Sequence, residues 1–186
     1  DLLFELCKSF PDYKIVFKPY KLEKPDVVKN ICQKNKKNKN FSLDESGSDY
    51  WELYSRTKIL ISDTSSTAFT FSLGLQRPVI FFSPNENKID TSILDGSYMA
   101  NRSNIGGIAK SIDEVIGLVR IMNDDYKFYL NKAIKFANKN FINPGESSKF
   151  AAYEILGILK IKRFILKSIF LRKKYKVIRE LFRKNN

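Results

Sequence analysis

Short apolar runs alternate with longer segments of helical spacing along most of the chain. Residues 14–18 (KIVFK) are rich in β-branched side chains and stop at a proline, which predicts a strand. Residues 26–34 have apolar positions three and four apart after a proline, which predicts a helix. By the same criteria we expect strands at 41–43, 58–62 and 79–82, helices at 50–56 and 65–75, and further helices beginning near Ser111, Asp124 or Asp125, and Ser147 or Ser148. Strands that alternate with helices favour βαβ units and a mostly parallel sheet.

Several connecting segments have simple interpretations. Residues 34–40 (KNKKNKN) have no apolar face, and we interpret them as a solvated loop rather than a nucleic-acid contact. Asp49 and Glu52 have the spacing of a capping box for the helix at 50–56. Glu86 is interpreted as an ordinary surface acid, and Gly106-Gly107 as a turn.

The C-terminal part of the chain differs in composition from the rest. Residues 151–186 carry 11 Lys/Arg and two acids, a net charge of +9, whereas the remaining 22 basic and 18 acidic residues leave +4 for residues 1–150. Apolar residues recur at helical spacing among these charges, with an interruption expected near 171–174. We therefore expect an α/β domain at 1–156, followed by a basic amphipathic helical extension at 157–186.

The extension has three possible partners. A basic amphipathic helix suits an anionic membrane surface, and residues 172–184 fit this description best. Residues 155–170 suit packing onto another part of a longer protein or onto a partner protein. Nucleic-acid binding is compatible with the charge alone, but no recognition motif supports it, and we do not expect it.

The overall composition excludes several kinds of site. The chain has no histidine, and its two cysteines, Cys7 and Cys32, are not arranged as CxxC. No Cys/His metal site is available, and reduced thiols are the expected state. The lack of histidine also removes the most common general base. No run approaches the roughly 18 apolar residues that span a bilayer. The chain begins with Asp1 and not with methionine, as expected of a fragment, a processed product or a trimmed chain.

Residues 58–82 (KILISDTSSTAFTFSLGLQRPVIFF) carry the main candidate for chemistry. Five polar residues follow a predicted strand directly and lead into a predicted helix: Asp63, Thr64, Ser65, Ser66 and Thr67. Ligands of open parallel sheets bind beyond the carboxyl ends of the strands, where helix N-termini favour anions. Such residues are also the preferred N-caps of any helix. Because one cap needs a single polar residue, the run of five favours a phosphate or pyrophosphate site.

Residues 58–82 resemble the strand–DxSS–helix–strand segment of the CDP-glycerol glycerophosphotransferases, the teichoic-acid-type polymerases and primases. Four further segments are similar to that family in the same order. KIVFKPY resembles a strand ending in KPHP, and DYWELYSRTKILISD resembles the stretch that precedes the polar residues. GGIAKSIDEVIGLV and NPGESSKFAAYEIL resemble two later segments, so the resemblance covers about residues 13–156.

The resemblance implies a fold and a site. The fold would be the C-terminal half of a GT-B arrangement, a Rossmann-like parallel sheet flanked by helices, which holds the nucleotide of an activated donor. By resemblance, residues 63–67 would lie near the donor's phosphates, and Lys18 would reach the same cleft. The turn carrying Ser46, Gly47 and Ser48 would approach the nucleotide from another side. Tyr20 occupies a position where the family normally has a histidine, and a phenol is a poor base near neutral pH.

The function implied is transfer of glycerophosphate from a CDP-activated donor to an acceptor hydroxyl in cell-surface polymer synthesis. The general base would lie in an N-terminal half, and the donor is a substrate, so no cofactor or metal is expected. The protein would be a cytoplasmic, peripheral enzyme on the inner face of the membrane. Two alternatives remain: a nucleotide-sugar glycosyltransferase of capsule or surface glycan synthesis, and a non-catalytic basic module that binds membranes.

Overall fold

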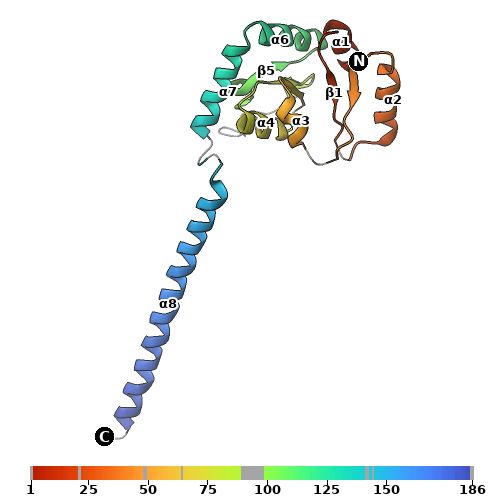
Figure 1. Ribbon diagram of the computed structural model, residues 1–186. Helices are drawn as coiled ribbons and strands as arrows, with labels where there is room; N and C mark the ends of the chain where they lie inside the picture. Colours follow the sequence, from red (N-terminus) through yellow and green to blue (C-terminus); the bar gives the residue numbers. More distant parts are fainter. Residues whose placement is uncertain are drawn as a thin grey trace. The chain divides into compact units, whose positions relative to one another are not determined.

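The computed structural model describes residues 2–20, 22–47, 50–63, 65–88, 99–140, 143 and 145–184 (Figure 1). In the last helix, the side chains are described through Phe164 and at Lys167 and Ile169. The chain forms two compact units, Asp1–Asn140 and Phe141–Asn186.

The first unit alternates strands and helices as predicted. Its elements are α1 (Leu2–Ser9), β1 (Ile15–Phe17), α2 (Pro25–Asn35), β2 (Phe41–Leu43), α3 (Trp51–Arg56), β3 (Leu60–Ser62), α4 (Thr67–Leu75), β4 (Val79–Phe82), the 3₁₀ turn η1 (Glu86–Lys88), α5 (Arg102–Ile105), β5 (Gly106–Ala109), α6 (Ile112–Asp124) and α7 (Tyr126–Asn140). The predicted cap of α6 is confirmed, because the Ser111 hydroxyl accepts a hydrogen bond from the Glu114 amide. Asp49, the predicted cap of α3, lies outside the described residues. The turn predicted at Gly106-Gly107 is wrong, because both glycines belong to strand β5.

All described strands pair in parallel. β1 pairs with β2, and β3, β4 and β5 form a second ladder in that order. The amino ends of β1 and β3 approach the same side chain of α6: Tyr13 Oη and Lys58 Nζ donate to Asn123 Oδ1 at 2.5 and 2.6 Å. The two ladders therefore approach each other where β1 and β3 begin. In open parallel sheets, ligands bind beyond the carboxyl ends of the strands.

The apolar run of β4 explains the layered core. Ile80 is buried in a cluster with residues of α1 and α6, whereas Val79 and Phe81 are buried in a second cluster with residues of α3, α4 and α5. Successive strand residues point to opposite faces, so β4 is covered by helices on both sides. A continuous apolar strand is typical of a parallel sheet buried on both faces. The predicted α/β class, with parallel strands flanked by helices, is confirmed.

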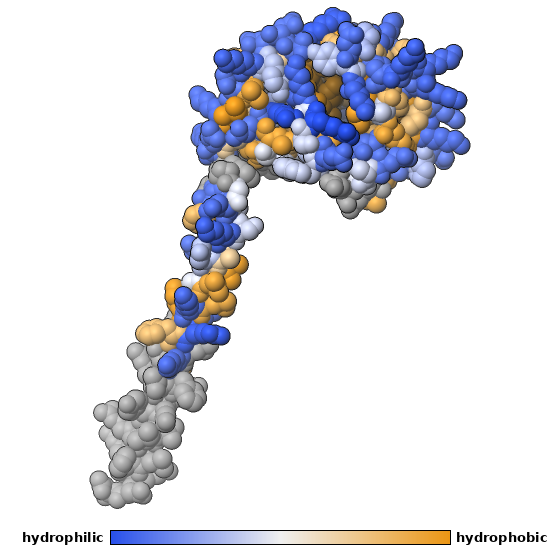
Figure 2. Space-filling view, viewed as in Figure 1, coloured by the Kyte–Doolittle hydropathy of each residue, from blue (hydrophilic) through white to orange (hydrophobic). Residues whose placement is uncertain are grey.

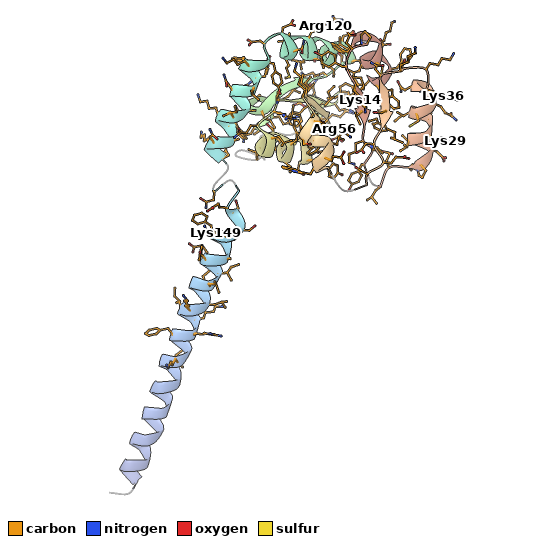
Figure 3. All side chains as sticks on the ribbon, in the orientation of Figure 1. Lys14, Lys29, Lys36, Arg56, Arg120 and Lys149 are labelled. Carbon is orange, nitrogen blue, oxygen red and sulfur yellow. The ribbon has the colours of Figure 1, made fainter. Side chains whose placement is uncertain are left out.

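The lysine/asparagine run at 34–40 is only partly a solvated loop. Asn35 is fully buried at the end of α2. The Asn40 side-chain amide donates to two backbone carbonyls of the first ten residues, at 3.1 and 3.0 Å. The lysines are exposed, and Lys29 and Lys36 extend outward from α2 (Figure 3). The solvated-loop prediction is right for the lysines and wrong for these asparagines, which attach the run to its neighbours.

The second unit consists of one helix, α8 (Ser147–Lys184). Asn143 and Gly145 precede it with positive φ angles of 55° and 80°, which breaks the chain after α7 as predicted. The interruption expected near 171–174 is wrong, because the helix is continuous there. The predicted domain boundary at 156/157 falls inside α8, and the division into two functional parts remains a prediction.

Apolar residues are exposed along the first half of α8. Polar and apolar residues alternate along its coloured part in Figure 2. Leu159 and Ile161 are both exposed, and they point roughly 200° apart because each residue turns the helix by about 100°. A helix that is apolar on several sides usually packs against protein. No helix within the described residues has a long enough apolar stretch to cross a membrane.

Candidate functional site

The carboxyl ends of the parallel strands carry most of the polar residues that the sequence singled out. Lys18 follows β1 directly, Asp44 follows β2, and Asp63 follows β3. Because the strands are parallel within each ladder, Lys18 and Asp44 share the carboxyl edge of the β1–β2 ladder, and Asp63 lies at the carboxyl edge of the β3–β4–β5 ladder. The carboxyl ends of parallel strands are the expected place for a ligand.

Lys18 forms the centre of a polar cluster at the ends of β1 and β2. Its Nζ donates to Asp44 Oδ2 at 2.7 Å and to Ser46 Oγ at 3.0 Å, and it lies 4.8 Å from the centroid of the Tyr50 ring. An ammonium has three N–H donors, so these three partners surround it. The hydrogen bond from Lys18 is the main reason that the pKa of Asp44 lies below its usual range. Lys18 is thus at the predicted edge, but its charge is balanced by Asp44.

The turn after β2 is held by the same carboxylate. Asp44 Oδ1 accepts a hydrogen bond from the Ser46 amide at 3.3 Å, and Oδ2 accepts one from the Ser46 hydroxyl at 3.0 Å. Gly47 follows with a positive φ of 66°. A Cβ added at this position would have no other atom within 4 Å. Ser48, the third residue predicted in this turn, lies outside the described residues.

The polar run after β3 begins α4 through local hydrogen bonds. Asp63 Oδ1 accepts from the Ser65 amide at 2.9 Å, and Ser65 Oγ accepts from the Thr67 amide at 3.3 Å. The Ser65 and Thr67 hydroxyls also bond to each other. Ser66, the N-cap residue, is exposed and its side chain makes no capping bond. Capping therefore uses Asp63 and Ser65, which leaves the Ser66 hydroxyl at the surface. Thr64 lies outside the described residues.

Two tyrosines of the α3 segment connect these two polar groups. The Tyr50 ring lies against Tyr54, with ring centroids 5.6 Å apart, and Tyr54 packs edge-on against Phe71 of α4. The Thr67 side chain is a hydrogen-bond partner of Tyr54, whose pKa is raised mainly by burial. Lys18 and Thr67 are therefore linked through one pair of rings. Sequence reasoning did not single out Asp44 as a site residue. The signal for Asp44 was its position directly after a strand, as for Asp63.

Tyr20 also lies at this edge, two residues beyond Lys18, and it is 63% exposed. Its phenol is therefore accessible where a histidine was expected by resemblance. Within the part of the chain that the structure describes, no group of three or more Asp, Glu or Cys side chains is arranged to hold a metal ion.

A second charged pair lies beyond the end of β4. The Arg102 guanidinium is 1% exposed and binds Glu86 through two bonds, Nη1–Oε2 at 2.9 Å and Nη2–Oε1 at 2.6 Å. Its Nε donates to the Met99 carbonyl at 2.9 Å. Hydrogen bonding from Arg102 is the main reason that the pKa of Glu86 lies below its usual range. The interpretation of Glu86 as an ordinary surface acid is wrong.

Comparisons with known proteins agree with this architecture. The family model for CDP-glycerol:poly(glycerophosphate) glycerophosphotransferase matches residues 7–149, well over half of the chain. The teichoic acid poly(glycerol phosphate) polymerase of Bacillus spizizenii is 31% identical over 120 residues, which cover 64% of this chain and 30% of the polymerase.

Two solved structures of the wall teichoic acid polymerase TagF share the fold. One has a TM-score of 0.60 at 24% identity and is matched over 86% of this chain and 38% of its own. The other, soaked with CDPG, has a TM-score of 0.56 at 20% identity and is matched over 87% of this chain and 40% of its own. The chain thus spans about a third of the length of the relatives it matches.

Proposed function

The chain belongs to the CDP-glycerol:poly(glycerophosphate) glycerophosphotransferase family, and from this premise we propose that it is the donor-binding part of a transferase of teichoic acid synthesis. In the proposed reaction, an acceptor hydroxyl attacks the phosphorus that carries glycerol in CDP-glycerol. The new P–O bond extends the polymer, and CMP leaves. The observation that carries the proposal is the polar carboxyl end of β3, where Asp63 and the N-terminus of α4 follow a parallel strand.

The residues at this edge have distinct proposed roles in binding the donor. The first amides of α4 and the hydroxyls of Ser65, Ser66 and Thr67 bind the donor's diphosphate, since a helix N-terminus favours negative charge. This stabilises charge that develops on the departing CMP. Lys18 and the turn at Ser46 and Gly47 form the adjoining side of the proposed donor site. The chain contains no histidine, and in this proposal the general base is supplied from outside the donor-binding part.

Nucleotide binding tests the proposal. Calorimetry of the purified protein with CMP, CDP, UDP and GDP is expected to show preferred binding of CDP. The double variant Ser65→Ala/Ser66→Ala is expected to bind CDP at least about tenfold more weakly, because a hydrogen bond to a charged group is worth about 1.5–3 kcal/mol. Thr70→Ala, an exposed change further along α4, is the matched control and should bind CDP normally.

The panel also distinguishes the alternatives. Preferred binding of UDP or GDP would indicate that the donor is a nucleotide sugar and not CDP-glycerol. If the wild-type protein bound none of the four nucleotides, the donor-binding role would be wrong. Thermal unfolding of the double variant should accompany the titration, because Ser65 caps α4 and its loss costs about 1 kcal/mol of stability.

We further propose that residues 172–186 place the enzyme on the inner face of the membrane. This segment (RKKYKVIRELFRKNN) mixes basic and apolar residues, and each basic residue near an anionic surface contributes about 1 kcal/mol. The preceding residues 155–170, exposed on several sides where they are described, are proposed to contact another part of the full protein. In this proposal residues 1–156 bind the donor and residues 157–186 form the extension.

Liposome flotation tests the role of the tail. The wild-type protein is expected to float with vesicles that contain anionic lipid and not with zwitterionic vesicles. Deletion of residues 172–186 is expected to reduce flotation strongly, and 0.5 M salt should do the same because it screens surface charge. Equal flotation with and without residues 172–186 would show that membrane binding, if present, lies elsewhere.

A further inference from the structure

Three aromatic residues in and beside α3 have very different surroundings. Tyr54 is 6% exposed and belongs to the core cluster with Phe71 and Phe81. Trp51 is 61% exposed. Tyr50, the N-cap residue of α3, lies between these extremes and packs against the core from its margin. Tyr50 is therefore partly accessible and also in contact with the core.

Two contacts fix the Tyr50 ring at the candidate site. The Lys18 ammonium lies 4.8 Å from its centroid, and the Tyr54 ring lies 5.6 Å away at an interplanar angle of 41°. Lys18 is in turn held by Asp44 and Ser46. A ring fixed in this way loses little conformational freedom when a flat partner stacks on it.

Tyr50 and the N-terminus of α4 are joined through Tyr54. Tyr54 separates Tyr50 from Thr67, the first residue of α4, because it touches both side chains. A nucleoside diphosphate likewise separates a charged diphosphate from a planar base by one ribose. With the diphosphate at the N-terminus of α4, the base can extend toward the Tyr50 ring.

We propose that Tyr50 is the stacking surface of a nucleobase subsite in the donor site, an inference that rests on the donor-binding role proposed above. Lys18 and Asp44 act as positioning residues for this ring. Stacking on an aromatic face is tolerant of base identity, so the subsite supplies affinity for a nucleoside, and discrimination between bases comes from other groups.

Paired titrations with CDP and inorganic pyrophosphate test the subsite. Tyr50→Leu is expected to weaken CDP binding about tenfold, since stacking of one base on an aromatic side chain is worth about that much, and to leave pyrophosphate binding unchanged. Tyr50→Phe keeps the ring and is expected to bind CDP like the wild type. Trp51→Leu, the adjacent exposed aromatic, is the matched control and should change neither affinity.

A measurement on the wild-type protein removes any dependence on the folding of the variants. With CDP bound, magnetisation transfer is expected between the Tyr50 ring protons and the cytosine H5 and H6 protons. Absence of this transfer, or a Tyr50→Leu variant that loses CDP and pyrophosphate equally, would overturn the subsite while leaving the donor-binding role intact. The subsite would also be overturned if the wild-type protein bound CDP no more tightly than pyrophosphate. Failure of the wild type to bind CDP at all would instead contradict the proposed function.

Discussion

Replacement of Gly106 by alanine is expected to abolish folding of the first unit. Gly106 faces Val79 in the β4–β5 ladder, and a Cβ added there would lie 1.6 Å from the Val79 carbonyl oxygen and 2.6 Å from its carbonyl carbon. Both atoms are backbone, so they can move only if the two strands separate. β4 supplies residues to both core clusters. The expected loss is on the order of 5 kcal/mol or more, comparable with the whole stability of a domain.

Two other glycines, Gly107 and Gly117, provide controls for this prediction. A Cβ at Gly107 would meet the methyl ends of Leu118 and Met122 at 2.8 and 3.3 Å, and these flexible side chains can shift. Gly107→Ala should therefore cost much less. A Cβ at Gly117, inside α6, would meet nothing within 4 Å, and Gly117→Ala should stabilise the protein by about 0.5–1 kcal/mol. Far-UV circular dichroism and thermal unfolding measure all three. A Gly106→Ala protein as stable as Gly107→Ala would contradict the packing of β5 against β4.

Replacement of Glu86 by glutamine should give the second-largest loss of stability. It leaves the Arg102 guanidinium, which is almost fully buried, without its counter-charge. Breaking a buried ion pair in this way costs about 3–5 kcal/mol. The double variant Glu86→Leu/Arg102→Met removes both charges and is expected to recover most of the loss. Glu52→Gln, which breaks the exposed pair with Arg56, should have no measurable effect.

The pH dependence of unfolding provides a separate readout for the same pair. The pKa of Glu86 is lowered in the folded protein, so its contribution to stability is fully present above the usual pKa of a glutamate. That contribution is lost as the pH falls through the lowered value. The free-energy difference between the wild type and Glu86→Gln should therefore be constant near neutral pH and shrink below about pH 4. A difference that did not change with pH would show that the carboxylate charge of Glu86 does not stabilise the fold.

The fold was largely predictable because its signals are local. The β-branched run that forms β1 stops at a proline, and Ser111 marks the start of α6. β5 was not predicted, because Gly106 and Gly107 were interpreted as a turn. Their role depends on Val79 and Leu118, which are distant in sequence. The asparagines of residues 34–40 were misread for a similar reason, since one of them is bound by carbonyls of the first ten residues.

The positions of the candidate residues in the fold were partly predictable, but their pairing was not. Asp63 was expected at the carboxyl end of a strand because it directly follows one, whereas Lys18 was expected there from the family resemblance. The ion pair between Lys18 and Asp44 joins residues 26 positions apart, and the pair between Glu86 and Arg102 joins residues 16 positions apart. Such pairs depend on which strands and loops are neighbours, so a charge pattern read along the chain does not reveal them. For the same reason, the sequence does not reveal that the Lys18 ammonium lies over the Tyr50 ring.

The most direct test of the donor-binding role is a crystal structure of the protein soaked with CDP-glycerol. We expect the diphosphate at the N-terminus of α4, with its oxygens within hydrogen-bond distance of the first helical amides and of the Ser65 and Ser66 hydroxyls. The cytosine should lie toward Tyr50, and the glycerophosphate should lie at the carboxyl end of β3. A nucleotide bound at the amino ends of the strands, or on α8, would contradict the account. So would an unoccupied carboxyl edge under conditions where calorimetry shows saturation.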